Sequence, residues 1–189
     1  MKYILKTNLI NIASIQTGVF LKPQSEGEIL YMQVKHFDNE FRLLHSVRAD
    51  LKEYSINQRH ILAPGDILFA AKGSNNFAAV YREEYPKAVA STSFLVIKIN
   101  NKNVLPEYIA WYINQQNSME WLKSFARGTS IPSISKSVLE DLEISLPELN
   151  VQKAILQIDE LRLKEKNIIN EIGILREQII QQQIFNALK

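Results

Sequence analysis

Basic and amide side chains gather in the first half of the sequence, where they could bind a polyanion. Residues 35–82 contain seven lysines and arginines, five acidic residues and all three histidines. Lysine and arginine bind phosphate oxygens, whereas asparagine, glutamine, arginine and serine can hydrogen-bond to base edges. The net charge of the chain is only +2, low for a nucleic-acid-binding domain. The distribution therefore permits a modest basic face and excludes a uniformly basic protein.

Three groups of side chains are candidate DNA contacts. The first lies in a turn where two adjacent amides are expected at an exposed hairpin tip, the second follows an expected strand, and the third lies in a Gly-Thr-Ser loop. An Asn-rich turn without a ligand and an ordinary solvated loop remain the alternatives for the first two groups. The residues are Lys72, Ser74, Asn75 and Asn76; Lys35, His36, Arg42, His45 and Arg48; and Arg127, Thr129 and Ser130.

Common catalytic and metal-binding patterns are absent from the sequence. There is no cysteine, and the histidines lack the helical spacing of metal ligands, which argues against a zinc site. No phosphate-binding glycine loop occurs. Ser133-Ile134-Ser135-Lys136 matches S-x-x-K, but about one such match is expected by chance and its companion motifs are missing, so we interpret it as a loop. We therefore expect no catalytic residue, no metal and no cofactor in this chain.

A change in composition divides the chain near residue 149. Residues 1–149 contain all six prolines and five of the six glycines, whereas residues 150–189 contain one glycine and no proline. The first part has short apolar runs typical of strands, together with helical stretches from Pro106 and around residues 119–125. This predicts an α+β domain with a mixed or antiparallel sheet and short helices over residues 1–149. The expected strands cover residues 29–34, 66–71, 77–81, 93–99 and 142–146.

Local signals refine this assignment. Turns at Pro64-Gly65-Asp66 and at residues 73–76 flank the second strand, which predicts a hairpin with the third. The pattern Ser137-Val138-Leu139-Glu140 predicts a helical capping box. We expect the helical aromatic side chains to be buried in the core rather than to stack on bases. These are Trp111, Tyr112, Trp121 and Phe125.

The last 40 residues have a heptad pattern typical of a coiled coil. With position a at Val151, eight of the eleven a and d positions are apolar. So wide an apolar stripe requires a partner surface. A helix over residues 150–189 would be roughly 60 Å long, so we expect it to project beyond the domain, the alternative being that it folds back. Its main partner-binding residues are Ile158, Leu161, Ile168, Ile172, Leu175 and Ile179.

Four segments resemble the target-recognition domain of Type I restriction–modification specificity subunits. Residues 64–74 are similar to the family's Gly-Asp-Ile-Leu strand with its basic residue and Gly-Ser turn. Residues 127–134 resemble its Gly-Thr-x-x-Pro loop, residues 139–147 its strand before the long helix, and residues 12–18 its opening strand. The family's usual glutamate after that strand is Val151 here, whereas Gln152 is kept. The family has two such domains and two helices, but this chain has one of each.

The resemblance implies a non-catalytic, cytoplasmic subunit that recognises double-stranded DNA. It would direct a methyltransferase subunit, and a restriction subunit where one is recruited, to a bipartite target. S-adenosylmethionine and ATP would bind those partners only. The helix over residues 150–189 would mediate homodimerisation and dock the methyltransferase subunit, and the Gly-Thr-Ser loop would hold the fold or grip phosphate. The alternative is a coiled-coil adaptor or inhibitor that binds a restriction–modification complex without reading DNA.

Overall fold

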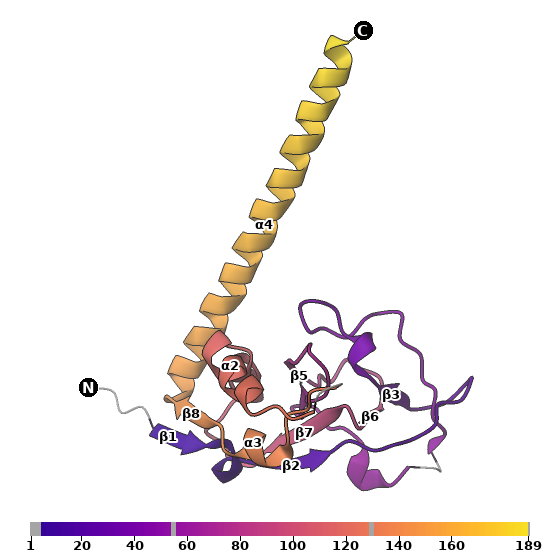
Figure 1. Cartoon of the computed structure of the whole chain (residues 1–189), viewed down its shortest axis with the longest axis vertical. Helices are drawn as coiled ribbons and strands as arrows, with labels where there is room; N and C mark the ends of the chain where they lie inside the picture. Colours follow the sequence, from indigo (N-terminus) through magenta and orange to yellow (C-terminus); the bar gives the residue numbers. More distant parts are fainter. Residues whose placement is uncertain (1–4, 54–55, 129–130, 189) are drawn as a thin grey trace. The chain divides into compact units, whose positions relative to one another are not determined.

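The computed structural model describes residues 5–53, 56–128 and 131–188 (Figure 1). The chain divides into two compact units, Met1–Leu149 and Asn150–Lys189. Within the described ranges, no helix combines the length and apolarity needed to cross a bilayer.

A four-stranded antiparallel sheet forms the centre of the first unit. Its order is β2 (Ala13–Thr17), β7 (Phe94–Ile99), β4 (Ile67–Ala70) and β5 (Ala78–Val80). Every residue of β4 is buried, which fits its uninterrupted apolar sequence Ile-Leu-Phe-Ala. The predicted hairpin is confirmed, because Ile67 pairs with Val80 and Phe69 with Ala78 in antiparallel register.

Two smaller strand pairs flank this sheet. Strand β3 (Leu30–Met32) pairs in parallel with β6 (Ala88–Ala90), and β1 (Leu5–Asn8) pairs antiparallel with β8 (Glu143–Leu146). The coexistence of parallel and antiparallel pairs confirms the α+β class with mixed pairing. Short 3₁₀ helices, η1 (Leu9–Asn11), η2 (Val34–His36) and η4 (Gln58–His60), lie in the connections.

Helix α1 (Pro106–Ile113) fixes the edge of the hairpin. Proline in its first turn confirms the predicted start. Asn114, which follows the helix, accepts from the Ala78 amide and donates to the Ala78 carbonyl, both at 2.8 Å. This side chain therefore satisfies both backbone groups of a residue on the outer strand β5, and it anchors the hairpin to α1.

The other two helices of the first unit correct the sequence analysis. In α2 (Gln116–Ser124) the buried residues are Ser118 and Leu122, so Trp121 and Phe125 lie off the buried face and are 37% and 49% exposed. These two rings pack on each other at 4.9 Å instead of entering the core. The N-cap of α3 (Lys136–Glu140) is Ser135, not Ser137, and its hydroxyl accepts from the Val138 amide.

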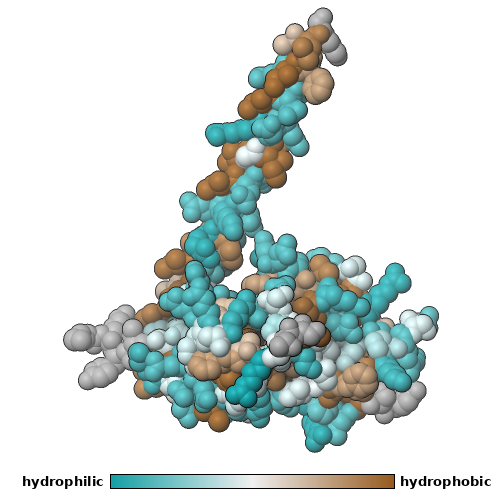
Figure 2. Space-filling model, in the orientation of Figure 1, coloured by the Kyte–Doolittle hydropathy of each residue, from teal (hydrophilic) through white to brown (hydrophobic). Residues whose placement is uncertain are grey.

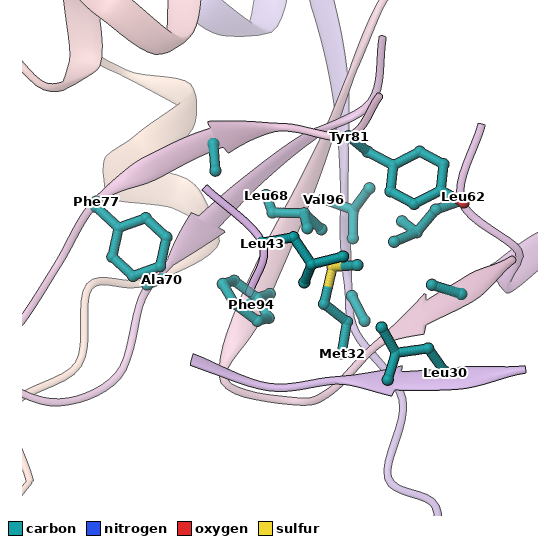
Figure 3. Packing of buried hydrophobic residues seen from close by; sticks show 13 residues of the cluster. Leu30, Met32, Leu43, Leu62, Leu68, Ala70, Phe77, Tyr81, Phe94 and Val96 are labelled. Atoms are coloured by element: carbon teal, nitrogen blue, oxygen red, sulfur yellow. The ribbon is translucent and has the colours of Figure 1, made fainter. Parts of the chain in front are cut away.

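An aromatic cluster joins an irregular loop to the hairpin. Phe77 and Phe94 are buried in one cluster with Leu43, Met32 and Val96, and in Figure 3 Phe94 lies beside Leu43 while Phe77 lies beside Ala70. Phe37 and Phe41 cover Phe77 from the loop, with ring centroids at 5.3 and 4.8 Å, and the Phe41 ring is stacked nearly parallel at 3°. Phe41 has a left-handed backbone with φ of 61°, which is unfavourable for a bulky residue. It lies in a tight turn in which the Asp38 amide donates to the Arg42 carbonyl and Asp38 Oδ1 accepts from the Glu40 and Arg42 amides.

The second unit consists of one helix, α4 (Leu149–Ala187), which confirms the predicted long C-terminal helix. Its 39 residues correspond to roughly 58 Å at 1.5 Å per residue. The large apolar a and d side chains from Ile158 to Ile179 are 44–66% exposed. Figure 2 shows apolar patches recurring along α4 between polar ones. That this helix projects beyond the first unit stays a prediction.

The first prediction concerns the aromatic cluster. Replacing Phe77 with alanine removes the ring on which Phe37 and Phe41 pack, and we expect it to lower the free energy of unfolding by about 3–5 kcal/mol. Phe20→Ala is the matched control, because the Phe20 side chain is 75% exposed and its loss should cost less than about 0.5 kcal/mol. Urea denaturation followed by circular dichroism measures both, and equal values for the two variants would contradict the role of the cluster.

Candidate nucleic-acid interface

The structure brings the first and third groups of predicted contacts together. Ser133 forms antiparallel bridges with both Lys72 and Arg127. The Gly73 amide donates to the Pro132 carbonyl at 2.8 Å, and the Arg127 and Ser133 backbones exchange hydrogen bonds at 3.0 and 2.8 Å. Lys72 and Arg127, far apart in sequence, therefore flank the same short segment. Thr129 and Ser130 lie outside the described residues.

The hairpin tip exposes most of its polar side chains, but not all of them. Lys72, Ser74 and Asn75 are exposed, and Gly73 supplies a φ of 92° that the turn requires. Asn76 is only half-buried rather than exposed, and its amide nitrogen donates to the Ala70 carbonyl at 2.9 Å. The expectation of two exposed amides is therefore wrong for Asn76, because its side chain closes the turn.

The second group begins with one exposed cation and one structural histidine. Lys35 is exposed at the surface of η2. The Gln33 amide donates to His36 Nδ1 at 3.3 Å, so this histidine caps the 3₁₀ helix. Burial, and then the charge of Lys35, lower the pKa of His36 below its ordinary value. The lowered pKa favours the neutral form of His36, and because its Nδ1 accepts a backbone hydrogen bond, His36 is a poorer phosphate ligand than Lys35.

The remaining members of the second group lie on the loop that follows. Arg42, His45 and Arg48 are exposed, and Arg42 forms an ion pair with Glu40 at 3.2 Å. The Leu44 amide donates to the His36 carbonyl at 2.9 Å, which keeps both ends of this loop together. Since the Phe37 and Phe41 rings pack on Phe77, which directly follows Asn76, the loop packs against the same hairpin that presents Lys72.

The resulting arrangement is a surface made from three distant segments. The residues 35–48, 72–75 and 127 contribute exposed cations and hydrogen-bonding groups around one hairpin. Such a surface can neutralise phosphates with its cations and contact base edges with Ser74 and Asn75. We call these residues the hairpin surface.

Sequence reasoning missed a cavity next to the hairpin surface. A cavity of about 530 Å³ is lined by residues from 20–23, 31–35 and 91–93. Ser93 in its wall accepts a hydrogen bond from the Ala71 amide at 2.9 Å, so the cavity adjoins the base of the hairpin tip. No local pattern marks these residues, since only tertiary pairing brings their segments together.

Comparison with known proteins gives consistent sequence matches. A family model described as the Type I restriction modification DNA specificity domain matches residues 9–177. The HindI specificity subunit of a Type I restriction enzyme from Haemophilus influenzae is 27% identical over 144 residues, which are 74% of this chain and 31% of that protein. The MjaVIII specificity subunit from Methanocaldococcus jannaschii is 28% identical over 133 residues, covering 70% and 28%. The chain thus spans less than a third of the length of these relatives.

Solved structures share the fold. The S subunit of a Type I restriction–modification system from M. genitalium superposes with a TM-score of 0.61 at 19% identity, covering 87% of this chain and 41% of that one. The HsdS subunit from Thermoanaerobacter tengcongensis superposes with a TM-score of 0.66 at 18% identity, covering 89% and 44%.

The second prediction separates the two amides of the hairpin tip. Asn76→Ala removes the hydrogen bond to the Ala70 carbonyl, and we expect a loss of about 1 kcal/mol in the free energy of unfolding. Asn75→Ala, one residue earlier and exposed, should change it by less than about 0.5 kcal/mol. Urea denaturation compares them, and a larger loss for Asn75→Ala than for Asn76→Ala would refute these assignments.

Proposed function

Because the chain belongs to the family of the Type I restriction modification DNA specificity domain, we propose that it is the sequence-reading component of a DNA-modification system. It binds double-stranded DNA and directs a partner methyltransferase, and a restriction subunit where one is recruited, to a chosen sequence. The observation that carries this proposal is the hairpin surface, where exposed cations and hydrogen-bonding groups from three segments gather around one turn.

The residues of the hairpin surface have distinct proposed roles. Lys35, Lys72 and Arg127 bind phosphates. His45 and Arg48, which lie on the loop that follows Lys35, also bind phosphates. Ser74 and Asn75 hydrogen-bond to base edges, since a serine hydroxyl and an asparagine amide both donate and accept. The Arg42 side chain is already paired with the Glu40 carboxylate. Asn76 and His36 form hydrogen bonds with backbone groups and so position the chain.

The proposal assigns no chemistry to this chain. Its part is binding energy that selects a sequence, while methyl transfer and any ATP-dependent step belong to partner subunits that bind S-adenosylmethionine and ATP. A cytoplasmic location fits this role, because the DNA substrate and these partners meet there.

The apolar stripe of α4 supports self-association. Side chains such as Ile172 and Leu175 are 44% and 50% exposed, and burying them against a second copy would remove this apolar surface from water. Two copies would supply two recognition units, and a symmetric pair addresses an inverted, bipartite target. The remaining apolar rows of the helix would dock the methyltransferase subunit.

The third prediction tests DNA binding. The double variant Lys72→Gln/Arg127→Gln should weaken binding to duplex DNA of any sequence. The slope of the logarithm of the binding constant against the logarithm of the salt concentration should become shallower by about 0.9 for each phosphate that the variant no longer neutralises. Lys102→Gln/Lys123→Gln is the control, since it removes the same charge from exposed positions of the first unit outside the hairpin surface. Fluorescence anisotropy over a salt series measures both slopes.

Selection from random duplexes completes this test. The wild-type chain should enrich a preferred sequence from the pool. Complex formation with a methyltransferase but without affinity for any duplex would refute DNA reading and favour the adaptor or inhibitor instead.

The fourth prediction tests self-association. Ile172→Asp/Leu175→Asp places two carboxylates in the a and d rows, where an apolar interface cannot solvate them, and the mass by light scattering should fall to that of a single chain. The control Asn170→Asp/Gln181→Asp adds the same charge to the polar side of α4 and should leave the mass unchanged. Equal masses for the wild type and the a/d variant would contradict dimerisation through α4.

A further inference from the structure

The cavity beside the hairpin surface lies at the carboxyl ends of parallel segments. Strands β3 and β6 are parallel, and Val19, beyond the end of β2, forms a further parallel bridge with Ser91. Parallel segments end at one edge, so the chain that leaves each of them meets there. The residues that leave them, 20–23, 33–35 and 91–93, line the cavity of about 530 Å³. This volume is within the range typical of ligand sites.

The backbone around Phe20 is held firmly on both sides. The Tyr31 hydroxyl donates to the Val19 carbonyl at 2.8 Å and accepts from the Leu21 amide at 3.3 Å. The Val19 amide donates to the Ala90 carbonyl at 2.9 Å. A Cβ atom on Gly18 would lie 2.1 Å from the Ser91 carbonyl oxygen, so only glycine permits this close approach.

This clamped loop presents an aromatic ring to solvent. Phe20 is 75% exposed, although both neighbouring residues are tied to the buried Tyr31. Folding has therefore already ordered the Phe20 backbone, so stacking of a ligand on this ring loses little further conformational entropy. An exposed phenylalanine on a rigid wall of a cavity is suited to a planar, apolar-faced ligand.

The other walls supply cations. Lys22 and Lys35 are exposed at the cavity, and none of the described residues that line it is acidic. The cavity therefore offers two positive charges to an anionic group placed beside the Phe20 ring.

We propose that this cavity takes a single nucleotide that has left the base stack of bound DNA. Its base stacks on Phe20, and its phosphate binds Lys22 and Lys35. The cavity adjoins the hairpin surface through the hydrogen bond between Ala71 and Ser93, so DNA held there passes the opening. This inference rests on the proposed DNA-binding function. A free mononucleotide has the same chemistry, and the test separates the two sources.

The fifth prediction compares two labelled duplexes that differ in one unpaired adenine. An unpaired base costs less to unstack, so the wild-type chain should bind the bulged duplex about tenfold more tightly than the paired one in fluorescence anisotropy. Phe20→Ala should abolish that preference and leave binding of the paired duplex within about twofold. Tyr31→Phe, which keeps the ring but removes the clamp on the loop, should reduce the preference.

Matched variants isolate the cavity from general effects. Phe125→Ala removes another exposed phenylalanine of the first unit and should retain the full preference for the bulged duplex. Equal melting temperatures of wild type, Phe20→Ala and Phe125→Ala show that differences in binding do not come from unfolding.

The outcomes distinguish the two proposals. If the wild type binds both duplexes equally and Phe20→Ala changes neither, the nucleotide site is wrong while DNA binding stands. If the wild type binds neither duplex, the proposed function itself is wrong. In a third outcome, the wild type shows no preference for the bulged duplex, but unlabelled deoxyadenosine monophosphate displaces a labelled mononucleotide from it. That result would contradict a nucleotide supplied by bound DNA and favour a free nucleotide as the ligand.

Discussion

The packing of Phe37 and Phe41 on Phe77 is the contact on which the hairpin surface depends. The loop over residues 37–48 has little regular structure. Its own backbone hydrogen bonds, between His36 and Leu44 and between Asp38 and Arg42, close it on itself. Burying these rings at centroid distances of 4.8–5.3 Å locks the loop to the hairpin that ends in the Lys72 turn. Aromatic pairs contribute about 0.5–1.5 kcal/mol beyond burial, and together with the turn closed by Asp38 they offset the cost of the left-handed Phe41 backbone, which is about 1–3 kcal/mol.

Parallel pairing provides the second positioning constraint. Strands β3 and β6 are only three residues long each, yet their shared direction brings the chain after Met32 and the chain after Ala90 to one edge. The loops that leave a buried strand pair can carry exposed, functional side chains without disturbing the core. Phe20 illustrates this division, because its neighbours are anchored to Tyr31 while its own ring remains in solvent.

Local signals in the sequence predicted the elements that local physics determines. Apolar runs bounded by glycine turns predicted the β4–β5 hairpin, Pro106 predicted the start of α1, and the heptads predicted α4. Strand β6 escaped prediction because Ala88–Ala90 is too short to show a period and is a strand only through its pairing with β3. The roles of Asn76 and Trp121 depend on residues nearby in sequence, Ala70 and Phe125, but the sequence pattern does not show which neighbour each side chain meets.

The two units offer surfaces whose interactions respond differently to solution conditions. The proposed contacts of Lys72 and Arg127 with phosphates would release counterions and weaken steeply as salt rises. The exposed isoleucines and leucines of α4 gain free energy by leaving water, and screening of charges does not reduce that gain. In the proposed dimer, assembly through α4 would therefore persist while the proposed DNA contacts exchange. A symmetric pair that reads a bipartite site would need this separation, because both copies must stay together each time the pair releases DNA.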